Sequence, residues 1–363
     1  MATECIAHLT QSFGCGGLEK VIVNLISNSQ HIPHVKHVVI SLTDDLEMAS
    51  TLPKNVEVVS LNKKPGTDPA VYWRLIKTLR KHNVTIFHTY NFGTIEYHTA
   101  ARLCGVKRQI HADHGLGGDD PKGANKKHNL LRKWVSHLIH EYVVVSDDLK
   151  KWITETVGVN KDKVTFVFNG VSVPSKPDLS ANLSNELKLV IIGRLAPVKN
   201  HERLFNAISI AKKEYPECQI HCNVVGNGPD DTKLKSLVKE LGLEENISFS
   251  GLCMDVSPHL KAADGFILSS DYEAMPMTVL EAMAANRPVI CPMVGGVTDF
   301  ISHQEAILVA GHSESALADG IGTLLNMSAI EREKLAGRGY ELVRDKYSME
   351  KMVNTYLELY RVD

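Results

Sequence analysis

Short apolar runs alternate with amphipathic stretches along almost the whole chain, and this alternation is the first structural signal. Residues 18–28 and 72–82 place apolar side chains at helical spacing, with charged side chains on the opposite face. The strand-like runs of the first half lie at residues 5–10, 37–43, 56–61, 85–90, 108–113, 142–146 and 164–169. Strands that alternate with helices predict a parallel sheet with helices on both faces.

The alternation is interrupted once, by a stretch rich in Ser, Pro and Asn at residues 169–186, which is typical of a linker. Strand-like runs then resume at residues 187–195, 219–226, 247–251, 265–270 and 288–293. We therefore predict an α/β protein with two doubly wound, Rossmann-like domains. Ligands of such sheets bind at the carboxyl ends of the strands, so a central cleft between the domains is the expected site.

The predicted domains comprise residues 1–172 and residues 173–344. Residues 349–362 form a plausible amphipathic helix. This helix either covers the second domain or crosses back to the first. In the second case residues from about 345 to 363 belong with the first domain.

Composition narrows the function only slightly. Of 363 residues, 44% are hydrophobic and 23% charged, as in ordinary globular proteins. The formal net charge of −2 gives no argument for a nucleic-acid partner. The seven scattered cysteines form no zinc motif and are expected to be reduced thiols in the cytoplasm. Neither a signal peptide nor a membrane-spanning run of roughly 18 apolar residues is evident, so any membrane contact is expected to be peripheral.

The segment EAMPMTVLE places two carboxylates, Glu273 and Glu281, around the start of a predicted helix. Pro276 is expected at the first helical position, since proline is favoured there. The unpaired N–H groups of such a helix start bind anions or hydroxyl-rich ligands, here from Met277, Thr278 and Val279. A phosphorylated, polyhydroxylated ligand fits this arrangement. The competing interpretation is an ordinary helix with one capping and one surface glutamate.

Two cations follow the first strand of the second domain. Arg194 lies at the strand end and Lys199 five residues later, a pair suited to a diphosphate. Each could equally be a solvated surface charge. Glycine turns follow other strands of the same sheet, at Gly226 and Gly228 and at Gly295 and Gly296.

The first domain offers a glycine-rich turn and two histidines at strand ends. Gly14, Gly16 and Gly17 precede a helix and let the backbone approach a ligand, or they simply form a tight turn. Glu19 occupies the last glycine position of a dinucleotide fingerprint, and no P-loop motif occurs, which argues against an NAD enzyme and a P-loop ATPase. His88 and His114 end strands, where each is either structural or able to hydrogen-bond a substrate or carry a proton.

Residues 122–134 form a basic segment that also carries apolar side chains. Its members are Lys122, Lys126, Lys127, Leu130, Leu131, Arg132, Lys133 and Trp134. Such a segment can lie on an anionic membrane, or it can be the solvated face of a helix.

Taken in order, the motifs resemble one enzyme family over nearly the whole chain. GGLEKVIVNL, HADHG, VVVSDDLKKW, FNGV, GRLAPVKNHERL, VVGNGPD, SSDYEAMPMTVLEAMAANRPVI and GGVTDFI follow one another as in the retaining glycosyltransferases of family 4, which have the GT-B fold. The E-x₇-E element from Glu273 to Glu281 is the hallmark of that family. A narrower resemblance points to bacterial sugar transferases that build exopolysaccharides or other surface glycans.

The resemblance implies roles for individual residues. Glu281 would accept hydrogen bonds from the nucleotide ribose, and Glu273 would hold hydroxyls of the transferred sugar. Arg194 and Lys199 would neutralise the diphosphate. His114 would contact the sugar near the reacting carbon. The remaining binding positions would be Gly16, Gly17, Ala274, Met275, Pro276, Met277, Thr278 and a nucleotide turn of Gly226, Asn227 and Gly228.

Two positions depart from the family pattern. Ala274 stands where the family usually has glycine, and it would be strained if that position required a positive φ. Asp299 is shorter than the acid usual at its position. Both departures affect the expected sugar preference.

The sequence therefore predicts a retaining, metal-independent hexosyltransferase without a cofactor. The expected donor is a nucleotide sugar, with UDP as its nucleotide, and the expected acceptor is a glycan or lipid-linked intermediate of surface polysaccharide synthesis. The expected location is the cytoplasm, with possible contact at the inner membrane face. Alternatives are a nucleotide-sugar epimerase, a phosphorylase of the same fold, or a non-catalytic partner subunit that binds a nucleotide sugar.

Overall fold

The computed structural model describes residues 4–116, 120, 123–176 and 185–361 and divides into two compact units. The first runs to Gly170 and also contains the C-terminal segment from Met349, whereas the second is Val171–Ser348. Part of the predicted linker, residues 177–184, lies outside the described residues. Each unit is described by itself below.

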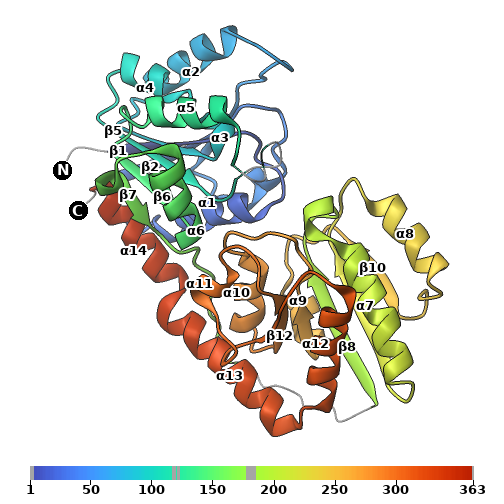
Figure 1. Cartoon of the computed structure of the whole chain (residues 1–363). Coiled ribbons are helices and arrows are strands. Elements are labelled where there is room, and N and C mark those ends of the chain that lie inside the picture. Colours follow the sequence, from blue (N-terminus) through green and yellow to red (C-terminus); the bar gives the residue numbers. More distant parts are fainter. Residues whose placement is uncertain (1–3, 117–119, 121–122, 177–184, 362–363) are drawn as a thin grey trace. The chain divides into compact units, whose positions relative to one another are not determined.

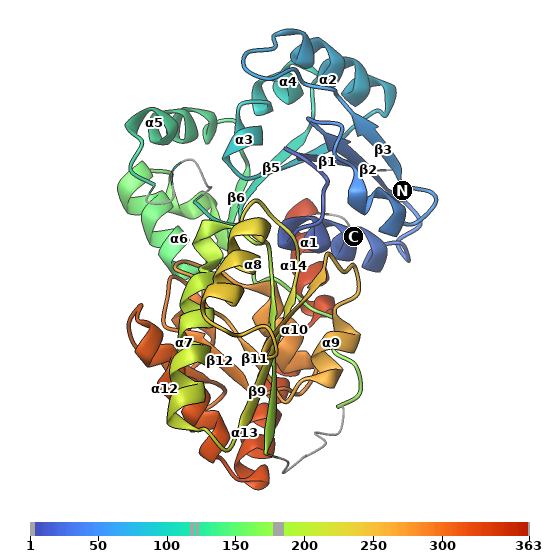
Figure 2. The same cartoon turned by 90° about the vertical axis from the view of Figure 1, so that its right-hand side faces the viewer.

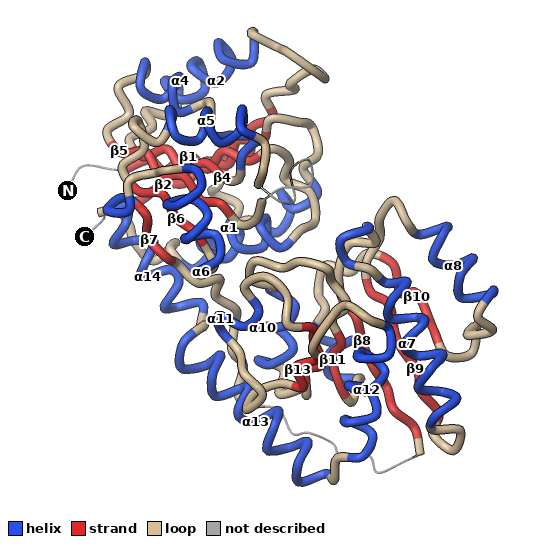
Figure 3. The backbone as a smooth tube through the Cα atoms, in the orientation of Figure 1, coloured by secondary structure: helices blue, strands red, loops and turns tan. Residues whose placement is uncertain are grey.

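The first unit is built on a parallel seven-stranded sheet with the order β3-β2-β1-β4-β5-β6-β7. Figure 3 shows its strands in red among blue helices. The strand order reverses between β1 and β4, and ligands of doubly wound sheets bind beside such a reversal. The strands are β1 (Glu4–Thr10), β2 (Val35–Ser41), β3 (Glu57–Ser60), β4 (Ile86–Tyr90), β5 (Arg108–Asp113), β6 (Glu141–Val144) and β7 (Val164–Phe166).

Helices cover both faces of this sheet (Figure 1). On one face α1 packs against the C-terminal helix α14, and elsewhere α2 packs against α4 and α3 against α5. The bounds are α1 (Gly17–Asn28), η1 (Glu47–Thr51), α2 (Ala70–Lys81), α3 (Phe92–Ile95), α4 (His98–Leu103), α5 (Lys126–Val135), α6 (Asp147–Lys151), the π-helical turn η2 (Trp152–Val157), η3 (Lys161–Lys163) and α14 (Met349–Tyr360).

A buried chain of hydrogen-bonded rings ties α14 to the first sheet. The Tyr360 hydroxyl lies 2.7 Å from Nδ1 of His88, which lies 2.9 Å from the Tyr90 hydroxyl. The same Tyr90 hydroxyl lies 2.8 Å from His8, and His8 lies 3.0 Å from His37. Burial lowers the pKa of His37 to about 4 and holds those of His8 and His88 well below the usual value. His88 is therefore a structural residue of the core.

The second unit has a parallel six-stranded sheet with the order β10-β9-β8-β11-β12-β13. Its order reverses between β8 and β11, which are direct neighbours with Gly265 opposite Leu189. The strands are β8 (Glu186–Ile192), β9 (Gln219–Val225), β10 (Ile247–Gly251), β11 (Gly265–Ile267), β12 (Val289–Pro292) and β13 (Ile307–Val309). Together the two units confirm the predicted fold class of two Rossmann-like parallel sheets.

The helices of the second unit lie on both sides of its sheet (Figure 2). The most extensive contacts between these helices join α7 to α12 and α10 to α13. The bounds are η4 (Pro197–Lys199), α7 (His201–Glu214), α8 (Asp231–Glu240), α9 (Ser257–Ala262), α10 (Met277–Ala284), α11 (Val297–Phe300), α12 (Glu314–Asn326) and α13 (Ala329–Lys346). The apolar run before Glu273 is a strand only over β11, so the predicted strand at 265–270 is shorter, and the rest of it forms the loop toward Glu273.

Candidate functional site

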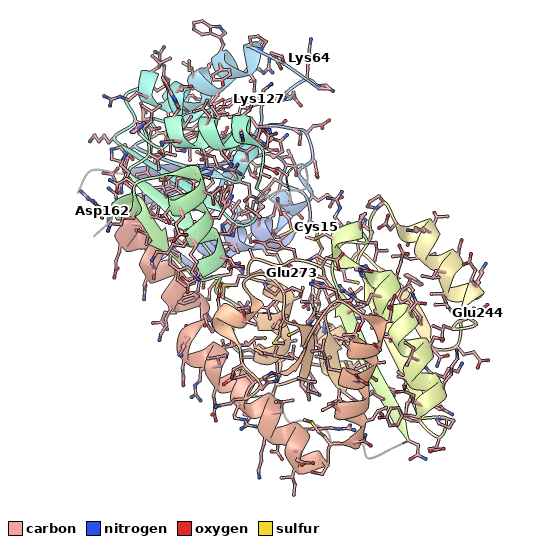
Figure 4. The ribbon with its side chains drawn as sticks, viewed as in Figure 1. Cys15, Lys64, Lys127, Asp162, Glu244 and Glu273 are labelled. Carbon is pink, nitrogen blue, oxygen red and sulfur yellow. The ribbon has the colours of Figure 1, made fainter. Side chains whose placement is uncertain are left out.

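The loops after β8 and β11 meet where the strand order of the second sheet reverses, and they join two predicted site residues. Lys199 Nζ lies 2.6 Å from Glu273 Oε1. The same oxygen accepts a hydrogen bond of 2.5 Å from the hydroxyl of Ser270. The Glu273 side chain is 11% exposed and that of Lys199 25%, so both still face solvent in part. Glu273 is labelled in Figure 4. The site thus presents an ammonium group and a carboxylate together, 74 positions apart in the chain.

A second set of bonds fixes the backbone beneath this pair. The Ser269 hydroxyl donates to the Lys199 carbonyl at 2.8 Å, and the Asp271 N–H donates to the Val198 carbonyl at 2.8 Å. The buried guanidinium of Arg203 donates to the Ser269 carbonyl and, at 2.8 Å, to Asp271 Oδ1. The two loops therefore form one framework.

Asn200 lets the chain turn from η4 into α7. It has a positive φ of 46°, and its side-chain oxygen accepts a hydrogen bond from the Arg203 N–H. Asn tolerates this left-handed conformation better than most residues and is a favoured helix cap. The turn places Lys199 immediately before the helix, as the sequence indicates.

The start of α10 differs slightly from the prediction. Pro276 is the N-cap, and Met277 is the first helical residue. The Val279 N–H donates to the Pro276 carbonyl at 3.2 Å, so it is not available to a ligand. The prediction of three unpaired N–H groups was wrong for Val279, because a tight first turn satisfies it. Glu281 lies one turn into α10 and is half-buried.

The expected strain at Ala274 is absent. Ala274 is buried and is not among the described residues with a positive φ. The glycine needed beside this loop is Gly295, in the turn after β12, with a φ of +50°. A Cβ added there would lie 2.1 Å from the Glu273 carbonyl oxygen, and the next N–H, of Gly296, donates to that oxygen at 2.8 Å. The turn of Gly295 and Gly296 therefore fixes the position of the Glu273 backbone.

The turn after β9 packs against the turn after β8 in the same way. Gly226 has a φ of +143°, and a Cβ there would lie 2.0 Å from the Gly193 carbonyl oxygen. Leu195 donates its N–H to the Asn227 carbonyl at 2.8 Å, and a Cβ on Gly228 would meet the Leu195 backbone. The predicted nucleotide turn is thus joined to the loop that carries Lys199.

Arg194 takes no part in the Lys199–Glu273 pair. Its side chain is exposed, and within the described ranges it has no ion-pair partner. Its proposed contact with a diphosphate stays a prediction.

In the first unit, Gly16 caps α1 and Gly17 is its first residue, as predicted for a glycine turn that leads into a helix. A Cβ on Gly16 would lie 2.4 Å from a carboxyl oxygen of Glu19. Burial and the nearby Asp45 raise the pKa of Glu19 to about 7. The carboxyl end of the Glu19 side chain therefore packs against Gly16, and a larger residue at position 16 would displace it.

His114 follows β5 and is held by Asn91, a residue that the sequence analysis missed. The backbone N–H of His114 donates to Asn91 Oδ1 at 2.8 Å, and Asn91 itself has a positive φ of 59°. Burial lowers the pKa of His114 to about 4, so its ring is neutral near pH 7. Two polar residues beside predicted strands were the available signals for these supports. Asn91, which holds His114, comes directly after strand β4, and Ser270, which donates to the Glu273 carboxylate, comes directly before Asp271.

The basic segment divides into buried and exposed parts. Lys122 lies outside the described residues. Arg132 is 1% exposed, 3.4 Å from Asp113, and stacked on Phe92 and Trp152. Its inclusion in a basic surface was wrong, because it compensates a buried carboxylate. The exposed part consists of Lys126, Lys127, Leu130, Lys133 and Trp134.

The described residues also lack two features, a metal-binding cluster and a membrane-spanning helix. They contain no group of three or more His, Cys, Asp or Glu side chains placed to hold a metal ion. Among these residues, no helix combines the length and the apolar character that crossing a membrane requires.

Two Rossmann-like sheets, with charged and glycine-rich loops at the strand-order reversal of the second, define the GT-B class of glycosyltransferases. The family model "Glycosyl transferases group 1" matches residues 176–342, and "Glycosyltransferase Family 4" matches residues 15–173. The chain therefore belongs to the family 4 glycosyltransferases, as the motifs predict.

Individual proteins agree with this assignment. "Mannosylfructose-phosphate synthase" of Agrobacterium fabrum is 33% identical over 180 residues, which are 47% of this chain and only 39% of that relative. The "Lipopolysaccharide core biosynthesis glycosyltransferase LpsD" of Rhizobium meliloti is 24% identical over 95% of both chains. Among solved structures, Anabaena Alr3699/HepE in complex with UDP and glucose superposes with a TM-score of 0.83 at 17% identity over 99% of both chains, which shows the fold.

Proposed function

We propose that this glycosyltransferase is a retaining, metal-independent enzyme that moves a hexosyl group from a UDP-sugar to a glycan or lipid-linked acceptor. The proposed process is surface polysaccharide synthesis. LpsD, which aligns over nearly the whole chain, is named for lipopolysaccharide core synthesis, and the solved HepE complex contains UDP. These names support the choice of acceptor class and nucleotide.

The observation that carries the proposal is the Lys199–Glu273 pair at the strand-order reversal. The ammonium group and the carboxylate lie 2.6 Å apart and neutralise each other. A sugar diphosphate would let each group bind a complementary partner: Lys199 the diphosphate, and Glu273 the sugar hydroxyls. The ion pair thus holds both groups in place before binding, which reduces the ordering cost of recognition.

Cations at this position supply the chemistry that the reaction needs. As the bond between the sugar and the diphosphate breaks, negative charge accumulates on the leaving phosphate. Lys199 and the exposed Arg194 would stabilise that charge directly, which is why we propose metal independence. In the retaining reaction the acceptor attacks from the side on which the diphosphate leaves, and the phosphate takes the acceptor proton.

The remaining proposed contacts follow the same reasoning. Glu281, on α10, would accept hydrogen bonds from the ribose. The N–H groups of Met277 and Thr278 precede the first hydrogen bond of α10 and would serve the bound sugar phosphate. In the first unit, neutral His114 would hydrogen-bond the sugar, and Gly16 and Gly17 would approach the diphosphate.

A transfer assay tests the proposal. Purified protein would be incubated with labelled UDP-hexoses and a lipid extract as acceptor, and UDP release and labelled product would be measured. Glu273→Gln and Lys199→Met should each lower transfer by roughly 100-fold or more, the scale for removal of one transition-state contact. The matched controls are Glu202→Gln and Lys233→Met, which break an exposed Lys–Glu pair in the same unit and should change transfer by about twofold at most.

The product distinguishes the alternatives. A product with the anomeric configuration of the donor, seen by NMR, supports a retaining transferase. Conversion of the UDP-sugar without acceptor would indicate an epimerase, and a requirement for free phosphate would indicate a phosphorylase. Binding of UDP-sugar without any turnover would favour the non-catalytic subunit and overturn the proposal.

A further inference from the structure

A pocket of about 390 Å³ lies in the first unit between helix α5 and the π-helical turn η2. This volume is at the lower end of the range of small-ligand sites, roughly 300–1,000 Å³. The residues that give it chemical character are Lys126, Asn129, Leu130, Lys133, Thr156 and Val157. None of the positions that line it is acidic.

The pocket wall on α5 is a single stripe of the helix. Lys126, Asn129, Leu130 and Lys133 follow the spacing i, i+3, i+4 and i+7, so they share one face. The two lysines are two turns apart, roughly 10 Å along the helix axis. They therefore flank Asn129 and Leu130.

The walls are held in place by buried contacts. Trp152, at the start of η2, donates its Nε1–H to the Gly123 carbonyl at 3.1 Å, and the Asn129 amide donates to the same carbonyl at 2.9 Å. A Cβ on Gly123 would lie 2.4 Å from the Trp152 indole nitrogen. Arg132, a buried residue of α5, stacks on the same indole, with its guanidinium carbon 4.8 Å from the ring centroid. The pocket is therefore a feature of the packed unit.

The polar groups of the pocket call for a ligand with two chemical properties. Both lysines are exposed, and neither forms an ion pair with a carboxylate of the described residues. Their ammonium groups favour an anion. Asn129 Oδ1 is buried and, within the described structure, accepts no hydrogen bond. A hydroxyl group of the ligand would satisfy it.

Apolar side chains lie beside these polar groups. Leu130 is 59% exposed and Trp134, one turn further along α5, is 72% exposed. Large exposed apolar residues next to lysines are typical of a helix that lies in the interface of an anionic membrane. A soluble sugar phosphate would account for the lysines and Asn129, but it would leave Leu130 and Trp134 in water.

We propose that this α5 pocket binds the phosphate and hydroxyl groups of a glycerophospholipid headgroup, while Leu130 and Trp134 enter the lipid surface beside it. The pocket would hold the first unit on a membrane that carries phosphatidylglycerol or a similar headgroup. This inference does not depend on the transferase proposal, because all its residues lie in the first unit, and the proposed cations and glutamates for the sugar donor lie in the second.

Vesicle sedimentation tests the inference. The full chain would be mixed with vesicles of phosphatidylcholine, with and without phosphatidylglycerol. We expect binding only when phosphatidylglycerol is present. The double variant Lys126→Ala, Lys133→Ala should bind roughly 30-fold more weakly, since each lysine near an anionic surface contributes about 1 kcal/mol.

A charge-matched control separates a headgroup site from diffuse attraction. Lys127→Ala with Lys151→Ala removes two exposed lysines that do not line the pocket (Lys127 is labelled in Figure 4). This pair should weaken binding clearly less than the pocket pair. Equal losses, or no loss for the pocket pair, would overturn the proposal. Urea unfolding of each variant, followed by tryptophan fluorescence, shows whether the first unit is folded, because all three tryptophans lie in it, and this measurement is independent of the vesicle result.

Free glycerol phosphate identifies the source of the ligand. If the wild type binds free glycerol phosphate through the pocket lysines but does not sediment with vesicles, the site serves a soluble phosphorylated ligand and the membrane proposal is wrong. Competition by glycerol phosphate against vesicle binding supports it. Asn129→Leu adds a test without a charge change: a headgroup seated in the pocket predicts weaker vesicle binding, whereas diffuse attraction to the membrane predicts unchanged or stronger binding. Because Asn129 also donates to the Gly123 carbonyl, the comparison requires that the first unit of this variant unfolds at the same urea concentration as in the wild type.

Discussion

At the scale of residues, the site in the second unit depends on pairs that are remote in sequence. Arg203 shows this well: it is 4% exposed, and its guanidinium holds both the Ser269 carbonyl and Asp271. Arg203 itself is not among the residues that we propose to contact the nucleotide sugar. Arg203 is therefore a positioning residue for Lys199 and Glu273.

The variant Arg203→Ala should lower the free energy of unfolding by about 2–3 kcal/mol, because it leaves a buried carbonyl unsatisfied. Urea denaturation would measure this. Since the framework beneath Lys199 is then loosened, the affinity for nucleotide sugar should fall as well. Unchanged stability together with unchanged affinity would contradict the positioning role.

The residue scale also shows the limits of prediction from sequence. The types and spacing of Lys199, Glu273 and Glu281 indicated an anion and sugar site before any fold was known. The direct pairing of Lys199 with Glu273 could not be predicted, since it depends on β8 and β11 being neighbours. Arg132, on helix α5, was misjudged because its buried partner, Asp113, lies on a different element, at the end of strand β5.

At the scale of elements, turns after parallel strands build the site. The strands themselves were predictable, because buried parallel strands are continuous apolar runs. The exception is β13, which the sequence analysis did not predict although it lies in the apolar run at residues 306–310. The packing of the turns could not be predicted from the sequence. Gly295 and Gly226 were recognised as glycine turns, but the backbones that they approach belong to distant loops.

Gly295→Ala tests the role of one such turn. The new Cβ would lie 2.1 Å from the Glu273 carbonyl oxygen, so the Glu273 loop must move. We expect nucleotide-sugar affinity to fall at least tenfold and the melting temperature to drop.

The control is Gly242→Ala, at a φ of +64° with nothing within 4 Å of the added Cβ. It carries only the backbone strain, about 1–2 kcal/mol, and should retain nucleotide-sugar affinity. Equal affinity losses in both variants would mean that general destabilisation, and not the displaced Glu273 loop, is the cause.

At the scale of the whole molecule, the two units differ in their titratable cores. The first contains His8, His37, His88, His98 and His114, all with lowered pKa values because they are buried. In the second, His201 is the one histidine among the described residues with a resolved downward shift, also to about 4. Acid should therefore affect the first unit more strongly.

The predicted pH dependence follows from these pKa values. Between the ordinary histidine pKa of about 6.5 and the lowered folded values, which are about 4 for His37 and His114 and about 3 for His98, the unfolded chain binds protons that the folded chain excludes. The free energy of unfolding of the first unit should thus be highest above about pH 6.5 and fall as the pH falls toward 4. All three tryptophans lie in the first unit, so their fluorescence during urea unfolding reports on it. A midpoint that does not change between about pH 7 and about pH 5 would contradict this account.

The central claim is that the carboxyl edge of the second sheet binds a nucleotide sugar through Lys199 and Glu273 without a metal ion. Thermal unfolding with UDP, GDP, ADP, CMP and their common sugars, with EDTA present, tests it most directly. Ligands that bind only the folded state raise the melting temperature, by the equivalent of about 2.7 kcal/mol at a hundredfold excess over Kd. We predict a shift with UDP and a UDP-sugar that EDTA leaves intact and that Lys199→Met removes. No shift with any nucleotide, or a shift that Lys199→Met retains in full, would contradict the claim.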